Sequence, residues 1–505
     1  MDSLWQQDPP VIPTDVVPVG DRFDIAVVGA GITGLTTALL FARAGRRTVV
    51  VEARSVGAVA TGHTTAKVSR LQGTMSTRIR SRNTAAVARA YAESQAAAFD
   101  WLAAYCEQAG VAFERRDAYS YARTQDALAR VDAEFRAARA VGIPVDRVEH
   151  VELPFATAGA VRLADQGQLD PMRLLAALAA EFRGLGGVLA DGARVTGVRA
   201  SSPAVVRTHA GDILAEKVVL ATGTPILDRG LYFAKLAAQR SYAQAWRVPA
   251  EQLPDGMFLD VEEPTRSIRT AGRDGERLLL TGGFGHGVGR HPSPRRAADA
   301  LAQWTREVWP GAEQVASWSA QDYLTPHGVP FVGWLPRGRG RIYLATGFSK
   351  WGMTNGVATA LTLVADILGA DGGRPSTGWQ TVLHRRPTLP AAIAVGIGDN
   401  AAVASWYARG WFGALTRPLG APPLEGAGEV GRDGLVPTAV SRVDGEVTAL
   451  CAICPHLGAI VGWNDAEHSW DCPAHGSRFA PDGTVLEGPA TRSMARRHAT
   501  PAPAG

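Results

Sequence analysis

The alternation of apolar and polar residues near the start of the chain predicts a strand, a turn, a helix and a second strand. Residues 23–28 form a short apolar run, which is typical of a strand buried in a parallel sheet. A glycine-rich turn follows, and apolar residues then recur with helical spacing to about Ala44. Residues 47–52 form another apolar run that ends in an acid. This order predicts the beginning of an α/β sheet.

Strand and helix patterns continue to alternate through the middle of the chain. Residues 82–109 are rich in alanine and predict one long helix. Two later strand-like runs, residues 218–223 and 342–347, both end in Ala-Thr-Gly. A helix rich in small apolar residues is predicted after the second run, over residues 355–368. We therefore expect an α/β fold with a Rossmann-like domain and an interleaved α+β domain.

The pattern changes near residue 370. Residues 370–390 and 418–434 are rich in glycine and proline, as linkers are, and residues 391–416 between them are apolar and weakly helical. From Val436 onward short strand patterns dominate, with Asp444-Gly445 as a predicted hairpin turn. The sequence thus predicts an N-terminal extension (1–22), a large α/β domain (23–370), a linker with one helix (371–434) and a small all-β domain (435–500).

The composition fits two or three domains with ordinary cores. The chain has 505 residues, 46% of them hydrophobic and 20% charged, and its formal net charge is +4. No block of like charges is present, so nucleic acid binding is not expected. Residues 1–20 lack the apolar run of a secretory signal, and no uninterrupted apolar stretch reaches the roughly 18 residues of a membrane span. We expect a cytoplasmic protein without a membrane span.

Three of the four cysteines cluster near the end of the chain, which favours a metal site over a disulfide framework. Cys454-x-His456 and Cys472-x-x-His475 each place one thiol and one imidazole on a predicted loop. A Rieske [2Fe–2S] centre needs two thiolates on one iron and two imidazoles on the other. The spacing therefore predicts these four residues as cluster ligands.

A zinc site is the alternative for the same region. Cys451 and Cys454 have zinc-ribbon spacing, and the later Cys-x-x-His pair would complete three thiols and one imidazole. That arrangement leaves His456 unused. It also does not account for residues 470–479 and 488–490, which closely resemble Rieske loops.

The loops differ from those of respiratory Rieske proteins in two ways. The resemblance implies that Ala459 and Ala474 stand where those proteins carry a disulfide, which suits a reducing compartment. Ser477 is kept and is expected to donate a hydrogen bond to a cluster sulfide. Phe479 stands where high-potential members carry a tyrosine. We therefore expect an intermediate potential, within the roughly −150 to +300 mV of Rieske centres.

Gly29, Gly31 and Gly34 fit the G-x-G-x-x-G fingerprint of a dinucleotide site and lie between a predicted strand and helix. These glycines permit the tight turn, the approach of a pyrophosphate and close packing of the helix. Glu52 ends the next strand, where an acid can bind a ribose. The fingerprint alone does not separate FAD from NAD. We favour FAD because only one fingerprint is present and because a flavin, unlike a nicotinamide, passes electrons singly to a Rieske cluster.

The chain up to about residue 370 resembles the D-amino-acid-oxidase (DAO) type of FAD-dependent oxidoreductase, in the branch fused to a C-terminal Rieske domain. The resemblance lies in residues 61–67, 240–242, 321–326 and 345–356. In this fold the turn after the last Ala-Thr-Gly strand lies against the flavin, and the helix that follows aims its free N–H groups there. The resemblance therefore implies further FAD-binding residues, which are His63, Thr64, Thr65, Lys67, Gly223, Gly347, Trp351, Gly352, Met353 and Thr354.

Three residues are candidates for the catalytic side of the site. His327 stands where the family more often has an aspartate, so it is either a base that faces the substrate or an ordinary hydrogen-bonded histidine. Lys350 lies in the most specific motif, where it would pair with an anionic substrate or flavin unless it is solvated. His286 is expected to lie in a glycine-rich loop, residues 282–287, near the expected substrate side.

The sequence as a whole predicts an FAD-dependent oxidoreductase that acts as a dehydrogenase on a small molecule. The resemblance implies an amine or amino acid as the substrate class. Electrons are expected to pass from flavin to the Rieske cluster and on to an external acceptor, whose identity is not predicted. The alternatives are an electron-transfer or redox-sensing module and a biosynthetic tailoring oxidase. A Rieske non-haem oxygenase is disfavoured, because no compact group of two histidines and a carboxylate follows the cluster.

Overall fold

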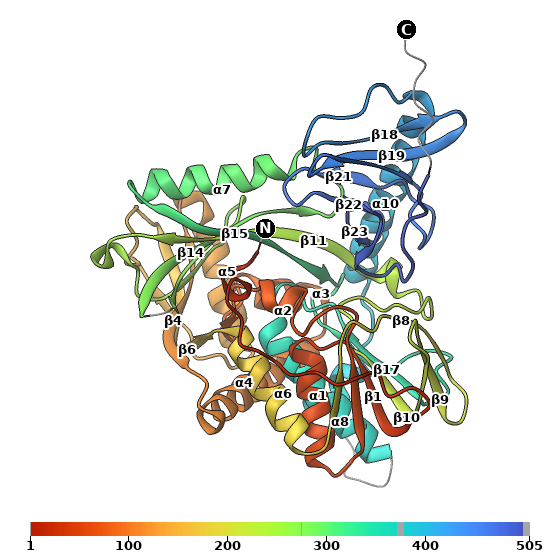
Figure 1. Cartoon of the computed structure of the whole chain (residues 1–505). Coiled ribbons are helices and arrows are strands. Elements are labelled where there is room, and N and C mark those ends of the chain that lie inside the picture. Colours follow the sequence, from red (N-terminus) through yellow and green to blue (C-terminus); the bar gives the residue numbers. More distant parts are fainter. Residues whose placement is uncertain (1, 274, 371–377, 498–505) are drawn as a thin grey trace.

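The computed structural model of the chain describes residues 2–273, 275–370 and 378–497. A large α/β part carries a small β domain at its C-terminal side (Figure 1). This arrangement confirms the predicted fold class. The beginning of the expected linker, 371–377, and the end of the expected β domain, 498–500, lie outside the described residues.

The first sheet contains, within the described residues, eight strands: β1 (Arg22–Val28), β2 (Thr48–Val51), β7 (Val188–Ala190), β8 (Val195–Arg199), β9 (Ala204–Thr208), β10 (Asp212–Leu220), β16 (Phe331–Trp334) and β17 (Ile342–Thr346). The order β17-β10-β1-β2-β7 is parallel throughout, and β16 adds an antiparallel edge. β1 and β2 lie in the middle and are buried, which explains their nearly continuous apolar runs.

The second sheet contains nine strands in the described part of the chain: β3 (Lys67–Val68), β4 (Phe113–Ala122), β5 (Asp146–Val148), β6 (Gly159–Leu169), β11 (Ala237–Arg247), β12 (Met257–Asp260), β13 (Arg266–Arg273), β14 (Glu276–Gly287) and β15 (Glu313–Leu324). It is mostly antiparallel, and β11 lies between β14 and β15. β11 and β15 run towards the small C-terminal domain (Figure 1).

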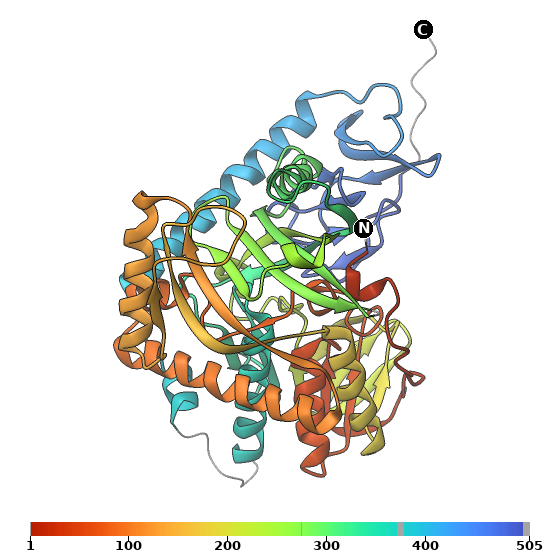
Figure 2. The same ribbon diagram turned by 90° about the vertical axis from the view of Figure 1, so that its left-hand side faces the viewer.

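The helices are α1 (Ile32–Arg43), α2 (Ala60–His63), α3 (Met75–Arg82), α4 (Ala85–Ala109), α5 (Leu128–Ala140), α6 (Pro171–Gly184), α7 (Pro294–Val308), α8 (Gly352–Ala370), α9 (Trp379–His384) and α10 (Pro390–Thr416). α1, α4, α6 and α8 contribute to one core between the two sheets, and α5 packs against β4 and β6 of the second sheet (Figure 2). The predicted helix 82–109 is α4. It begins late because the Thr84 hydroxyl caps it by accepting a hydrogen bond from the Val87 N–H.

The C-terminal domain has two small antiparallel sheets, made of β18 (Gly428–Asp433), β19 (Val436–Val443) and β20 (Glu446–Cys451), and of β21 (Gly462–Asn464), β22 (Ser469–Asp471), β23 (Arg478–Phe479) and β24 (Val485–Glu487). Asp444 and Gly445 have φ values of 52° and 78° and form the predicted hairpin turn between β19 and β20. β18 pairs with β19, so the β domain takes in residues before the expected boundary at 435.

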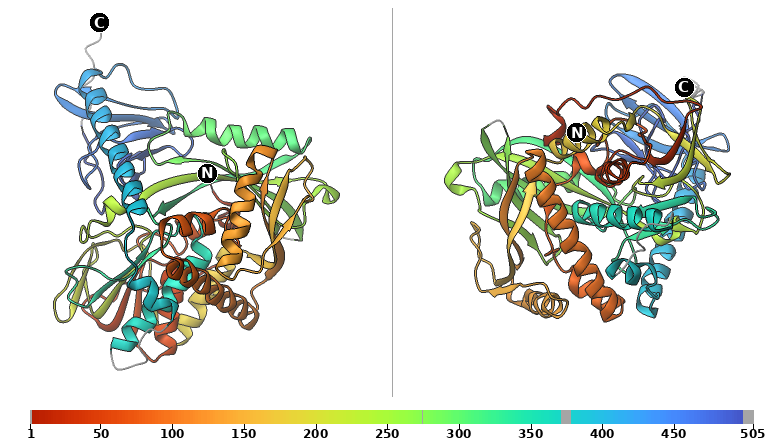
Figure 3. Two further views of the ribbon diagram at one scale, coloured as in Figure 1. Left: turned by 180° about the vertical axis from the view of Figure 1, so that it is seen from behind. Right: turned by 90° about the horizontal axis from the view of Figure 1, so that it is seen from below.

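The segment between the two parts holds α9 as well as the expected helix, α10. Seen from behind, α10 runs along the side of the molecule from the large part to the C-terminal domain (Figure 3). Asn400, near the middle of α10, donates to the Ala234 carbonyl oxygen of the large part, and the Trp411 indole donates to the Gly458 carbonyl oxygen of the C-terminal domain. α10 therefore ties the two parts together. No described helix is both long enough and apolar enough to cross a bilayer.

Candidate flavin cavity and cluster site

A cavity of about 580 Å³ is lined by residues of both sheets of the large part. The carboxyl ends of β1 and β2 contribute Gly29, Gly31 and Glu52 to the wall, and β11 and β15 contribute Tyr242 and Tyr323. Ligands of α/β proteins bind at the carboxyl ends of parallel strands. The volume is also in the usual range of small-molecule and cofactor sites, roughly 300–1,000 Å³.

The glycine-rich turn leaves no room for side chains. Gly29 has a φ of +107°, and a Cβ on it would lie 2.5 Å from a carbonyl oxygen of residue 221. A Cβ on Gly34 would overlap the Gly29 carbonyl, so α1 packs directly on the turn. Gly34 itself does not reach the cavity. One carboxylate oxygen of Glu52 accepts a hydrogen bond from the Ala30 N–H at 2.8 Å, which holds this acid at the cavity wall.

Replacing Gly34 by alanine is expected to lower the FAD content of the purified protein. The new methyl group meets backbone and cannot be accommodated by a side-chain rotation, and such overpacking costs about 1–3 kcal/mol. Flavin absorbance per chain measures the effect. Gly184→Ala is the matched control, because nothing lies within 4 Å of a Cβ at that end of α6. Equal flavin content in the two variants would contradict the expectation.

The predicted residues His63, Thr64, Thr65 and Lys67 all line the cavity. The His63 ring is fixed by a hydrogen bond between Nδ1 and the Val59 carbonyl oxygen at 2.8 Å. Burial lowers the pKa of His63, so this ring is neutral at neutral pH.

Lys67 is the buried cation of the cavity wall. Its ammonium group donates to the Ser267 hydroxyl. The side chain is exposed to the cavity and not to bulk water, so burial, together with the charge of Arg269, lowers the pKa of Lys67 to about 7. The cavity therefore offers a lysine whose charge changes near neutral pH.

The turn before α8 has an unusual backbone. Ser349 and Lys350 have φ values of 53° and 70°, which are uncommon for residues with side chains. The Asp322 carboxylate accepts hydrogen bonds from the N–H groups of Lys350 and Tyr323, and the Ser349 N–H donates to the Tyr323 carbonyl oxygen at 3.1 Å. Strained turns of this kind cluster at functional sites, where surrounding contacts hold them.

This turn delivers several of the predicted residues to the cavity. Lys350, Trp351, Gly352 and Met353 line it, and so does Gly223 from the other Ala-Thr-Gly turn. α8 begins at Gly352, so its free N–H groups face the cavity, as the sequence predicts.

Gly347 and Thr354 are not among the described residues that line the cavity. Gly347 has a φ of +79° and packs against Thr325, which makes it a structural turn residue. The Thr354 hydroxyl accepts a hydrogen bond from the Gln72 side chain at 3.1 Å, which supports the first turn of α8 from behind.

Asp322 is a cavity residue that the sequence reasoning did not single out. Burial raises the pKa of Asp322 to about 6, although hydrogen bonds from the Tyr323 and Lys350 N–H groups oppose the shift. The sequence feature that could have identified Asp322 is its position as an acid within residues 321–326, a stretch that resembles the family.

His327 is not among the described residues that line the cavity. Its Nδ1 accepts a hydrogen bond from the Val329 N–H at 3.2 Å, and its ring packs on Phe331. Burial, and then the charge of Arg386, lower the pKa of His327 to about 3. These contacts favour the alternative of a hydrogen-bonded structural histidine.

His286 lies one residue behind the cavity wall. Its Nε2 is 2.9 Å from the hydroxyl of Tyr242, which does line the cavity. The His286 ring also stacks on His291 at 4.6 Å. A direct contact with a bound substrate therefore has no support from its placement.

The four predicted cluster ligands lie on two neighbouring loop tips of the C-terminal domain. Each loop is a tight turn, because the Gly458 N–H donates to the Cys454 carbonyl oxygen and the Gly476 N–H donates to the Cys472 carbonyl oxygen. The His456 and His475 rings are 5.2 Å apart. Contact with Cys472, supported by the N–H groups of nearby loop residues, holds the pKa of Cys454 below its usual value.

The unsatisfied atoms at this site fit a Rieske cluster. The Nδ1 atoms of His456 and His475 are both buried without a hydrogen-bond partner in the described part of the chain. The His456 Nε2 is 3.0 Å from a carboxylate oxygen of Asp228, which places the proton on Nε2 and leaves Nδ1 free to bind iron. The two thiols contact each other and the two imidazoles contact each other, so the loops offer the two ligand pairs that a Rieske cluster needs.

The zinc alternative gains no support from the geometry. Cys451 is the last residue of β20, where it pairs with Thr438. Across the described residues, no three or more His, Cys, Asp or Glu side chains converge on a position for one metal ion. A cluster with one thiol pair and one imidazole pair does not need such a group.

The cluster loops face the large part of the chain. The Phe233 ring lies against both imidazoles, with centroids 5.9 Å from His456 and 5.2 Å from His475. Three residues of the C-terminal domain, Leu486, Glu487 and Gly488, line the cavity itself. The cavity wall therefore includes part of the domain that carries the cluster loops.

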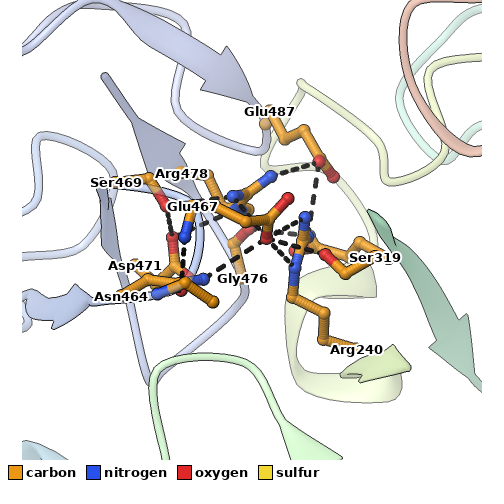
Figure 4. Close-up of polar contacts among 12 residues, drawn as sticks. Arg240, Ser319, Asn464, Glu467, Ser469, Asp471, Gly476, Arg478 and Glu487 are labelled. Atoms are coloured by element: carbon orange, nitrogen blue, oxygen red, sulfur yellow. Dashed lines mark hydrogen bonds and ion pairs between the residues drawn. The ribbon is translucent and has the colours of Figure 1, made fainter. Parts of the chain in front are cut away.

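A buried network of charges fixes this contact (Figure 4). Arg240 of β11 is 2.5 Å from a carboxylate oxygen of Glu467 and 3.6 Å from Glu487. Arg478 pairs with both of these glutamates and with Asp471. Burial alone would raise the pKa of Glu467, but the charges of Arg240 and Arg478 lower it to about 2. Glu467 is therefore ionised at neutral pH.

Comparison with known proteins agrees with both halves of the site. Residues 24–366 match the family described as FAD dependent oxidoreductase (DAO), and residues 427–498 match the Rieske [2Fe-2S] domain. Over 481 residues the chain is 31% identical to YhfW of Bacillus subtilis (strain 168), described as a Rieske 2Fe-2S iron-sulfur protein, with 93% of this chain and 92% of YhfW covered. The chain belongs to the DAO family of FAD-dependent oxidoreductases. The prediction of the family and of both cofactors, FAD and a Rieske cluster, is confirmed.

Two further proteins are each similar to one part of the chain. The cytochrome b6-f complex iron-sulfur subunit of Bigelowiella natans is 51% identical over 49 residues, which cover 10% of this chain and 19% of that protein. The glycine oxidase of Geobacillus kaustophilus matches with a TM-score of 0.58 at 21% identity, covering 71% of this chain and 96% of that one. The second likeness shows the fold of the flavin part.

Proposed function

We propose that this FAD-dependent oxidoreductase is a dehydrogenase that oxidises a small amine or amino acid and sends the electrons through its own Rieske cluster to an external acceptor. The shared cavity wall is the observation that supports this proposal. Leu486, Glu487 and Gly488 of the Rieske domain line the same cavity as the glycine fingerprint of the FAD domain. Electrons would thus leave the flavin without any movement of a domain.

The charged groups of the cavity suit an amino acid or a related amine. Lys67, Arg78 and Lys350 line it and would attract a carboxylate. Asp322 lies beside Lys350, and because burial raises the pKa of its carboxyl to about 6, it is suited to accept a proton from an amine near neutral pH.

The proposed reaction balances with a one-electron acceptor. Oxidation of a C–N single bond to an imine releases two electrons and two protons. Both protons leave to water, and the external acceptor takes one electron twice for each substrate molecule. The bound flavin would receive the electron pair, and the cluster would carry single electrons.

We also propose the cytoplasm as the compartment. Ala459 and Ala474 are buried in the two cluster loops, so no disulfide can join the loops at these positions. Loops without that bridge suit a reducing compartment.

Anaerobic mixing of the protein with a panel of amines and amino acids tests the proposal. Visible and EPR spectra are recorded together. We expect a substrate to bleach the flavin first and a reduced-Rieske EPR signal to follow. A panel that leaves the flavin oxidised, while reduced pyridine nucleotide or a protein partner bleaches it, would favour the electron-transfer module instead.

A further inference from the structure

One cluster-ligand loop, residues 472–477, is packed tightly on the end of the second sheet. A Cβ on Gly476 would lie 2.5 Å from the Ala238 Cβ, and a Cβ on Gly289 would lie 2.8 Å from backbone atoms of the loop. Arg290 donates a hydrogen bond to the Pro473 carbonyl oxygen at 2.8 Å. The loop therefore has one fixed position against the flavin domain.

Gln321 of β15 joins this loop to the cavity. Its side chain is buried, and its Nε2 donates to the Gly476 carbonyl oxygen and to the Tyr323 hydroxyl, both at 2.8 Å. Gln321 and Tyr323 both line the cavity. Gly476 directly follows the ligand His475. One amide group thus links a cavity side chain to the peptide next to a cluster ligand.

We propose that Gln321, with Tyr323, provides the route for electrons from the flavin cavity to the Rieske cluster. This inference rests on the proposed function. Hydrogen bonds and covalent bonds couple a donor to an acceptor better than open space does. The route consists only of such bonds, from the Tyr323 ring through Gln321 and Gly476 to the adjoining residue His475. Each transfer would take one electron from the bound flavin and add one to the cluster, and the external acceptor would reoxidise the cluster between transfers.

A route through the ring of Phe233 would not reach the cavity. Phe233 touches both ligand imidazoles, but it is not among the described residues that line the cavity. The geometry therefore favours the Gln321 route over one through Phe233.

The route is tested by blue-light excitation of the bound flavin in the presence of EDTA, which reduces the flavin without any substrate. Cluster reduction is then followed by visible absorbance and freeze-quenched EPR. In Gln321→Leu, which removes both donated hydrogen bonds, we expect cluster reduction to slow by on the order of tenfold, the scale typical of losing a partner just outside the ligands. The cluster EPR spectrum and midpoint potential are expected to stay as in the wild type, which a general disturbance of the loop would not allow.

Two further variants make the test decisive. Ser293→Ala removes another hydrogen bond between the two parts, from the Ser293 hydroxyl to Asp465 at 2.6 Å, away from the cavity wall, and should leave the rate unchanged. Tyr323→Phe removes the hydrogen bond from Gln321 to the Tyr323 hydroxyl, together with the long one, 3.5 Å, from that hydroxyl to the Gly488 carbonyl oxygen. It should also slow the transfer, and it serves if Gln321→Leu fails to fold. An unchanged rate in the Gln321 and Tyr323 variants, or equal slowing in Ser293→Ala, would overturn the route. A wild-type cluster that stays oxidised beside reduced flavin would instead overturn the proposed function.

Discussion

Replacing Cys472 by serine is expected to abolish the Rieske EPR signal and all reduction of the external acceptor, while the flavin stays bound. Cys472 is buried at a loop tip, and backbone N–H groups of Ala474 and His475 point at its sulfur. A serine hydroxyl does not replace a thiolate in holding iron at neutral pH. Iron content, EPR and flavin absorbance measure the outcome on the same sample.

Cys451→Ser is the matched control for that result. The spacing of Cys451 and Cys454 is that of a zinc ribbon. Cys451 is, however, the last residue of β20, and its N–H donates to the Ala495 carbonyl oxygen at 2.8 Å. We expect this variant to keep two irons per chain, as a [2Fe–2S] cluster requires, and the full EPR signal. Loss of metal in Cys451→Ser, with zinc in the wild type, would refute the assigned ligands.

The parts of the site that could be predicted from the sequence are those whose residues lie close together along the chain. The glycine turn, Glu52 and the motif around Lys350 each lie within one loop between predictable elements, so their spacing carries their geometry. The four proposed cluster ligands rest on the same kind of local pattern, since each loop supplies one thiol and one imidazole.

The contacts that join the two halves of the molecule were not predictable. Asp228 meets His456 across 228 residues of sequence, and Gln321 meets Gly476 across 155. Such pairs depend on how two folded parts dock, and no local pattern encodes that. For His327 the sequence left two alternatives open, a base that faces the substrate and an ordinary hydrogen-bonded histidine. In the structure its ring lies against Phe331 and Arg386, which favours the second alternative.

Replacing Arg240 by methionine is expected to loosen the Rieske domain from the flavin domain. Arg240 is only 3% exposed, and its loss leaves Glu467 with fewer compensating charges in a buried site. Breaking a buried ion pair from one side costs about 3 kcal/mol. Loss of the cluster's visible circular dichroism in urea measures the effect, and the midpoint should fall by roughly 1 M or more.

Arg247→Met is the control that separates burial from charge. Arg247 lies on the same strand, β11, and also pairs with a glutamate, Glu276, at 2.5 Å, but its side chain is 53% exposed. Water and salt screen such a pair, so its loss should leave the urea midpoint nearly unchanged. Equal midpoints for the two variants would mean that the Arg240 network contributes no more than a surface pair. If the urea midpoint falls in Arg240→Met but not in Arg247→Met, the buried charges between the cavity and the cluster stabilise the contact between the two domains.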